Sequence, residues 1–162
     1  MKTVRLLFST TRWPLSAAIR AFTWSRWSHV ALVDGDTVIE AAAVHGVRRA
    51  PLVDTIARAA DHAFVDLPAT DPSAVIAAAA GEVGKPYDYT ALVGLALRRD
   101  WQACDAWFCS ELVAWAFDAA GQPLLRAEVV RRVTPQHLWM LLPAPSTAAA
   151  PAPSFNPLTT QE

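Results

Sequence analysis

The chain is poor in the residues that build metal centres and disulfide frameworks. It has two cysteines and four histidines among 162 residues, and it contains neither an HExxH segment nor a CxxC pair. We therefore expect no catalytic metal and no cofactor. The cysteines, Cys104 and Cys109, lie five positions apart, and two free thiols in a reducing compartment are the simplest interpretation.

An excess of one charge and long apolar runs are also missing. The formal net charge is −1, from 14 basic and 15 acidic side chains, and arginines occur in isolated pairs such as Arg48-Arg49 rather than in a stripe, which argues against nucleic-acid binding. The basic, apolar start is interrupted by Arg12 and Pro14 before a signal-peptide core or a membrane span is complete. We expect a cytoplasmic protein without a transmembrane segment.

What the chain does have is enough apolar material for one domain. Hydrophobic residues make up 53% of the sequence, which suffices for a core at this length. The end of the chain is different, because proline, alanine and serine dominate it from Pro143 to Pro157. We expect a catalytic domain over residues 1–142 and a mobile tail over residues 143–162.

Apolar spacing and turn residues outline the secondary structure of the domain. The chain alternates short strands and helices without the regular βαβ rhythm of a wound sheet, so we expect an α+β fold with an antiparallel sheet packed against helices. Strands are expected at residues 4–8, 28–33, 37–42, 44–53 and 63–67, and helices at 14–22, 54–60, 72–84, 87–97 and from 109 onward.

Cys109 has the setting of a catalytic nucleophile. Apolar residues follow it at Leu112, Val113, Ala116 and Phe117, the spacing of a helix face turned toward a core. At a helix start, unpaired N–H groups and the positive end of the dipole favour a thiolate. A buried cysteine can equally be a small apolar core residue, so the nucleophile interpretation requires a base elsewhere in the chain.

A predicted hairpin supplies that base and a partner for it. Two strand-like segments containing His29 and Glu40 flank the sequence Asp34-Gly35-Asp36. If residues 34–35 form the turn, the two side chains lie directly opposite each other, and if residues 35–36 do, they are diagonal neighbours on one face. A three-residue loop would place them on opposite faces. With either two-residue turn, they resemble a base and its orienting carboxylate.

Four blocks of this sequence resemble the permuted papain-like amidases of the NlpC/P60 superfamily. They are Trp27-Ser28-His29-Val30-Ala31-Leu32-Val33, Val38-Ile39-Glu40-Ala41, Gly84-Lys85-Pro86-Tyr87-Asp88 and Phe108-Cys109-Ser110-Glu111-Leu112-Val113. The group in question includes the YaeF/YiiX-like proteins and is related to the lecithin retinol acyltransferase-like enzymes. In the ordinary NlpC/P60 order the cysteine comes first, whereas here the histidine precedes it, which is the permuted arrangement.

The resemblance implies a circularly permuted papain-like fold and a cysteine-dependent amidase or peptidase. Cys109 would be the nucleophile, His29 the base and Glu40 the third member, and the substrate would be a cell-wall peptide or another amide. Tyr87 matches a tyrosine of the superfamily and would help to hold the oxyanion. A thiol acyltransferase, a lipid-ester hydrolase and a catalytically silent binding or assembly module remain alternatives on the same fold.

Other aromatic and histidine residues have simpler interpretations. Trp27 and Trp107 each lie two residues from a catalytic candidate and are predicted to line a substrate pocket, although core packing would also explain them. His137 follows Pro135 in what reads as a short capped helix, which indicates a structural role. His45 and His62 have no partner at a metal-ligand spacing and are expected at the surface or a sheet edge.

Overall fold

The computed structural model describes residues 2–87, 107–126 and 133–141. In chain order the elements are β1 (Thr3–Thr10), α1 (Pro14–Thr23), β2 (His29–Asp34), β3 (Thr37–Ala42), β4 (Gly46–Pro51), α2 (Leu52–Arg58), β5 (Asp61–Pro68), α3 (Pro72–Gly81), α5 (Cys109–Ala119) and α6 (Pro135–Met140). The tail and Cys104 lie outside the described residues. The helix expected at 87–97 also lies outside them, except for its first residue.

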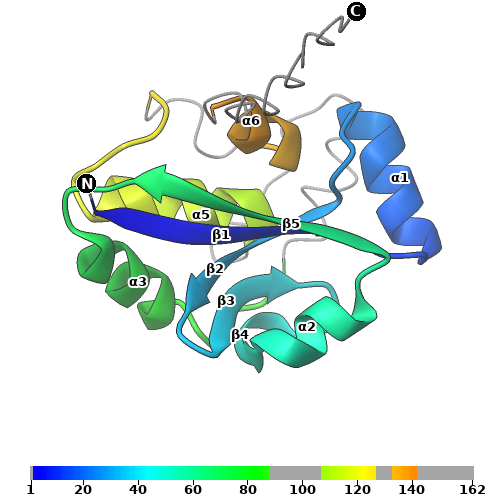
Figure 1. Ribbon diagram of the computed structural model, residues 1–162, viewed down its shortest axis with the longest axis horizontal. Helices are drawn as coiled ribbons and strands as arrows, with labels where there is room; N and C mark the ends of the chain where they lie inside the picture. The colour runs from blue at the N-terminus through cyan, green and yellow to red at the C-terminus, as the bar shows by residue number, and fades with distance from the viewer. Residues whose placement is uncertain (1, 88–106, 127–132, 142–162) are drawn as a thin grey trace, which may run out of the picture.

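A five-stranded antiparallel sheet forms the centre of the fold (Figure 1). The strand order is β4-β3-β2-β1-β5, and β1 pairs with β2 on one side and with β5 on the other. Consecutive strands β2, β3 and β4 are neighbours because short turns join them. The predicted α+β class and the antiparallel sheet are confirmed.

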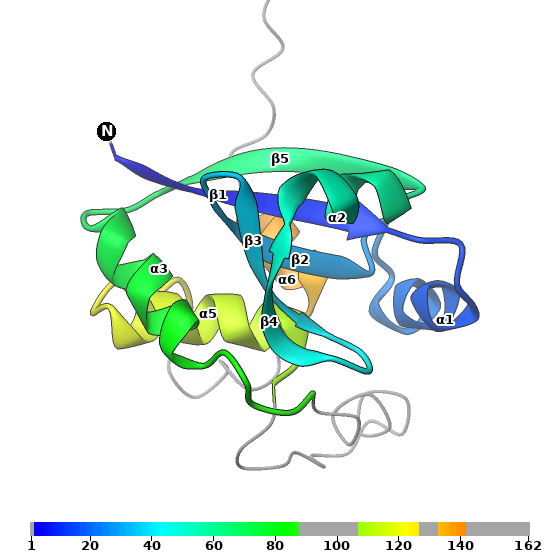
Figure 2. The ribbon, with the colours of Figure 1, turned by 90° about the horizontal axis from the view of Figure 1, so that it is seen from below.

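The sheet carries a different helix layer on each face. On one face Leu7, Ala31 and Val38 pack against α2 in a small apolar cluster. The other face contributes Val30 and Ile39 to the main core, which also contains Cys109 and the buried side of α5. Figure 2 shows α2 in front of the sheet and α5 and α6 behind it.

Several element boundaries differ from those expected. The strand expected at residues 44–53 is limited to Gly46–Pro51, because Leu52 donates its backbone N–H to the Asp36 carbonyl and begins α2 there. The strand expected at 63–67 is longer, Asp61–Pro68, because it pairs with β1 along its whole length. Within the described residues, no helix is both long and apolar enough to cross a bilayer.

Candidate active site

The β2–β3 hairpin brings His29 and Glu40 together. Asp34 pairs with Thr37, so Gly35 and Asp36 form the turn and Gly35 takes a positive φ of 58°. This is the second of the two registers that the sequence allowed, and it makes the two side chains diagonal neighbours on one face. His29 Nε2 lies 2.8 Å from Glu40 Oε2.

Arg48 completes the surroundings of Glu40. It stands directly opposite Glu40 in the β3–β4 register, and its Nε and Nη2 donate to Glu40 Oε1 at 3.0 and 2.8 Å. The Glu40 residue is only 3% exposed. Burial would raise the pKa of Glu40, but the contacts with His29 and Arg48 outweigh it and lower that pKa to about 2. Glu40 is therefore a buried, fully ionised carboxylate.

Cys109 is the first residue of α5 and is buried at 1% exposure with a free thiol. The helix begins after the extended residue Phe108, whose backbone N–H is accepted by Glu111 Oε2 at 3.4 Å. A carboxylate in the first turn stabilises the helix start through the dipole. The first helical bond runs from the Leu112 N–H to the Phe108 carbonyl, so the N–H of Cys109 itself precedes the helical ladder.

His29 links the carboxylate to the thiol. Burial alone would lower the pKa of His29, but hydrogen bonding and charge from Cys109 and Glu40 outweigh burial and raise it to about 10. Since Nε2 faces Glu40, Nδ1 is the ring nitrogen that remains for the sulfur. The arrangement can hold an imidazolium between the Glu40 carboxylate and the sulfur of Cys109.

The contact between His29 and Cys109 is made where β2 begins. By the two-residue period of a strand, His29 and Glu40 belong to the same sheet face as Ala31 and Val38, the face that packs against α2. Helix α5 packs on the other face of the sheet. His29 is the first residue of its strand. At that end of the sheet His29 contacts Cys109, the first residue of α5.

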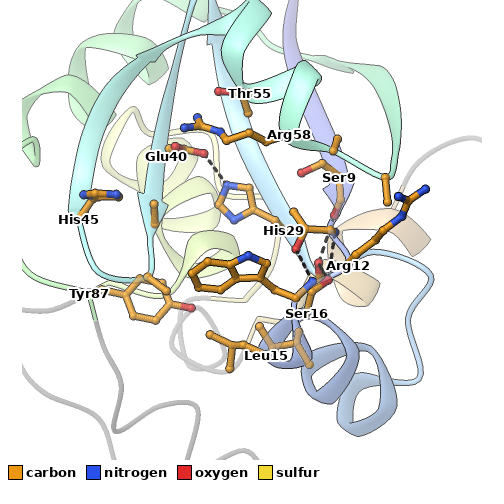
Figure 3. A pocket seen from close by; sticks show the side chains of 18 of the residues that line it. Ser9, Arg12, Leu15, Ser16, His29, Glu40, His45, Thr55, Arg58 and Tyr87 are labelled. Carbon is orange, nitrogen blue, oxygen red and sulfur yellow. Dashed lines mark hydrogen bonds and ion pairs between the residues drawn. The ribbon is translucent and has the colours of Figure 1, made fainter.

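A pocket of about 610 Å³ opens beside His29. It is lined by the end of β1, by α1, by the β3–β4 loop and by α2, and Figure 3 shows His29, Glu40 and Tyr87 around it. Three buried hydroxyl groups hold α1 against the sheet here, with Ser16 Oγ lying 3.0 Å from Thr10 Oγ1 and 2.7 Å from Ser28 Oγ. Cys109 is not among the residues that line this pocket, but His29, which contacts Cys109, is.

The predicted aromatic site residues separate into two groups. Tyr87 lines the pocket and is 8% exposed, and its short bridge to Trp107 ties the two segments together. Trp27 is 1% exposed and packs its ring against Phe8 and Trp139, and Trp107 Nε1 donates to Glu82. Neither tryptophan lines this pocket, so their role in substrate binding stays a prediction.

The remaining three histidines lie at the surface or in a helix cap. His137 caps α6, because its Nδ1 accepts from the Thr134 N–H at 3.1 Å while its own N–H donates to Thr134 Oγ1, so it has the structural role expected of it. His62 is exposed beside Phe64. His45 is also exposed, but it lines the pocket.

Sequence reasoning missed three arginines at this site: Arg48, Arg12 and Arg58, which all line the pocket. The pairing of Arg48 with Glu40 depends on the register between β3 and β4. The loop that joins these strands sets the register, and in this loop the non-glycine residue Val44 has a φ of 78°. Turn composition does not reveal such a loop.

Comparison with known proteins identifies the family of the chain. A family described as "Permuted papain-like amidase enzyme, YaeF/YiiX, C92 family" matches residues 2–150, and no curated protein matches the chain. Among solved structures, the crystal structure of metalloprotein yiiX from Escherichia coli O157:H7 is similar with a TM-score of 0.63 and 23% identity, covering 85% of this chain and 91% of that chain. That likeness concerns the fold. Because the family match spans most of the sequence, the chain belongs to the YaeF/YiiX family of permuted papain-like amidases, C92, as the resemblance predicted.

Proposed function

We propose that the protein hydrolyses an amide through a thioester acyl-enzyme formed on Cys109, with His29 as base and Glu40 as the group that orients His29. The observation that carries the proposal is that one imidazole contacts both a buried ionised carboxylate and a helix-start thiol. The amidase family supplies the reaction class. Nucleophile, base and orienting carboxylate together are the arrangement that nucleophilic catalysis needs.

The proposed reaction runs in two halves. In the first, the Cys109 sulfur attacks the amide carbonyl carbon, and the C–N bond breaks as His29 gives its proton to the departing amine. A thioester remains on Cys109. In the second, His29 takes a proton from water, the resulting hydroxide attacks the thioester carbonyl, and the C–S bond breaks to release the carboxylic acid and the thiolate.

The start of α5 supplies groups for the oxyanion. The backbone N–H groups of Cys109 and Ser110 precede the first helical bond, which Leu112 donates. N–H groups at this end of a helix are oriented along the positive dipole and favour developing negative charge. Tyr87 lies in the wall of the pocket beside His29, and the family resemblance implies an oxyanion role for it.

The proposed mechanism uses protein groups alone. The Escherichia coli neighbour is described as a metalloprotein, but in this chain His29 and Arg48 occupy the two oxygens of Glu40. In the ranges that the structure describes, no three His, Cys, Asp or Glu side chains are grouped to hold a metal ion. This donor set does not fit a metal centre.

Acyl-enzyme trapping tests the proposal. The protein is incubated with an activated ester, p-nitrophenyl acetate, quenched in acid and weighed intact. We expect one acetyl group on Cys109, its loss in Cys109→Ala and its retention in Cys104→Ala. An acetyl group that persists in Cys109→Ala, or the absence of any acetylated species, would contradict the proposal.

A further inference from the structure

We propose that the pocket beside His29 selects substrates that carry an anionic group, a carboxylate or a phosphate, at a distance from the scissile amide. The inference rests on the proposed function for its chemistry, because it takes Cys109 as the reacting group. Its binding part depends only on the charges and shape of the pocket.

The lining of the pocket has a marked positive excess. It includes Arg12, Arg48 and Arg58, whereas Glu40 is the only acidic residue among the described residues that line it. That carboxylate is already engaged by Arg48 and His29. The whole chain has a net charge of −1, so the positive charge of the pocket is local. Clefts lined by one sign of charge concentrate ligands of the opposite sign.

Two of these arginines are available to a ligand. Arg12 lies between β1 and α1, and Arg58 is the last residue of α2. Both side chains are exposed, and Figure 3 shows them on different sides of His29. Neither has a hydrogen bond or ion pair to another described side chain, whereas three exposed arginines elsewhere pair with aspartates: Arg5 with Asp66, Arg26 with Asp61 and Arg49 with Asp34.

The apolar part of the pocket could hold the portion of a substrate that links the scissile amide to the anionic group. Leu15 and Ile19 of α1, with Trp13 before them, give it an apolar wall. An apolar chain can lie along that wall while its charged end reaches a guanidinium. Guanidinium groups bind carboxylates and phosphates through paired, charge-assisted hydrogen bonds, which is why both anions belong to the proposed class.

Matched alkylating probes test this selectivity. Each probe is a bromoacetamide with an alkyl spacer of increasing length that ends in a carboxylate, a phosphonate or a neutral amide. The rate of Cys109 alkylation in the full chain is followed by intact mass. We expect an anionic probe to react at least about fivefold faster than its neutral match, and the preference to fall about two- to fivefold in Arg12→Gln or Arg58→Gln, the range for partly exposed ion pairs. Added salt should also reduce it.

Arg49→Gln is the matched control, because Arg49 is an exposed arginine outside the pocket, and it should keep the full preference. The carboxylate and phosphonate arms show which anion is favoured. Equal rates for anionic and neutral probes, or a preference unchanged in the Arg12→Gln Arg58→Gln double variant, would overturn the inference while leaving the proposed function intact.

A second measurement separates binding from chemistry. Unreactive acetamide analogues of the same probes are titrated into Cys109→Ala and followed by NMR. Tighter binding of the anionic analogue, weakened in the arginine variants, would support the inference even if Cys109 resists alkylation. Equal binding of anionic and neutral analogues would overturn it.

Discussion

Glu40 shows what a buried charge can do at the scale of one residue. Its carboxylate is held ionised by His29 and Arg48, and it helps to keep His29 protonated. Glu40→Gln preserves the shape but removes the charge that stabilises the imidazolium. We expect the rate of acetylation by p-nitrophenyl acetate to fall about ten- to hundredfold, less than in Cys109→Ala, because members of a catalytic unit contribute unequally. An unchanged rate in Glu40→Gln would remove Glu40 from the mechanism.

Arg48 acts through Glu40, and its role can be tested by measuring the free energy of unfolding. Arg48→Met leaves a carboxylate at 3% exposure with His29 as its charged partner. Removing one partner of a buried pair is costly, and we expect a loss of about 2–4 kcal/mol at pH 7 in the free energy of unfolding. The loss should shrink toward pH 3. In the wild type the low pKa of Glu40 keeps it ionised there, whereas in the variant that pKa rises and protonation relieves the buried charge.

Arg49→Met is the control for that measurement. Arg49 is the next residue on β4, but it is exposed and pairs with Asp34 at the surface, so its removal should cost less than about 1 kcal/mol. Chemical denaturation of both variants at pH 7 and pH 3 distinguishes them. If the two losses are equal, or if the loss in Arg48→Met does not depend on pH, Arg48 does not stabilise the ionised form of Glu40.

At the scale of elements, the turn before Tyr87 is held to β4 by backbone hydrogen bonds. Val47 donates its N–H to the Lys85 carbonyl at 2.8 Å, and the Gly84 N–H donates to the Val47 carbonyl at 2.9 Å. Gly46 makes this close approach possible, because a Cβ at its position would meet the Lys85 carbonyl oxygen. The approach places Tyr87 in the pocket wall.

Gly46→Ala should therefore be strongly destabilising. Gly46 has a φ of 70°, which costs alanine about 1–2 kcal/mol, and the overlap with the Lys85 carbonyl adds about 1–3 kcal/mol. Gly35→Ala is the matched control, because Gly35 has a φ of 58° and open space around it. Thermal unfolding should show a larger loss for Gly46→Ala. Equal losses would mean that the turn yields to the added methyl group.

The elements that the sequence predicts best are those with local signals. The β2–β3 hairpin, the proline-led start of α1 and the Asp71 cap of α3 appear as expected, because turn and capping chemistry act between near neighbours. The contact of Arg48 with Glu40 was not predicted, because it depends on the register between β3 and β4. The loop that sets this register has an unusual backbone at Val44. The pocket was not found either, because it joins α1, α2 and four strands that only the tertiary structure assembles.

At the scale of the whole molecule, the site joins two distant parts of the chain. His29 is the first residue of β2, near the N-terminus, and Cys109 is the first residue of α5, much later in the chain. The permuted order was recognisable from the sequence blocks and is supported by the family match over residues 2–150. The interaction of the two side chains is the feature that the proposed function requires of the fold.

The pH dependence of Cys109 alkylation measures that interaction. The rate of reaction with iodoacetamide is followed from pH 5 to pH 10 in the wild type and in His29→Ala, with Cys104 as the internal reference. With the pKa of His29 raised to about 10, the imidazolium persists through neutral pH and stabilises negative charge on the sulfur. We expect Cys109 in the wild type to react faster than Cys104 and, at pH 6, at least about tenfold faster than in His29→Ala, whose rate should rise steeply only toward alkaline pH. Equal rates at both cysteines, unaffected by the loss of His29, would contradict the pairing of Cys109 with His29.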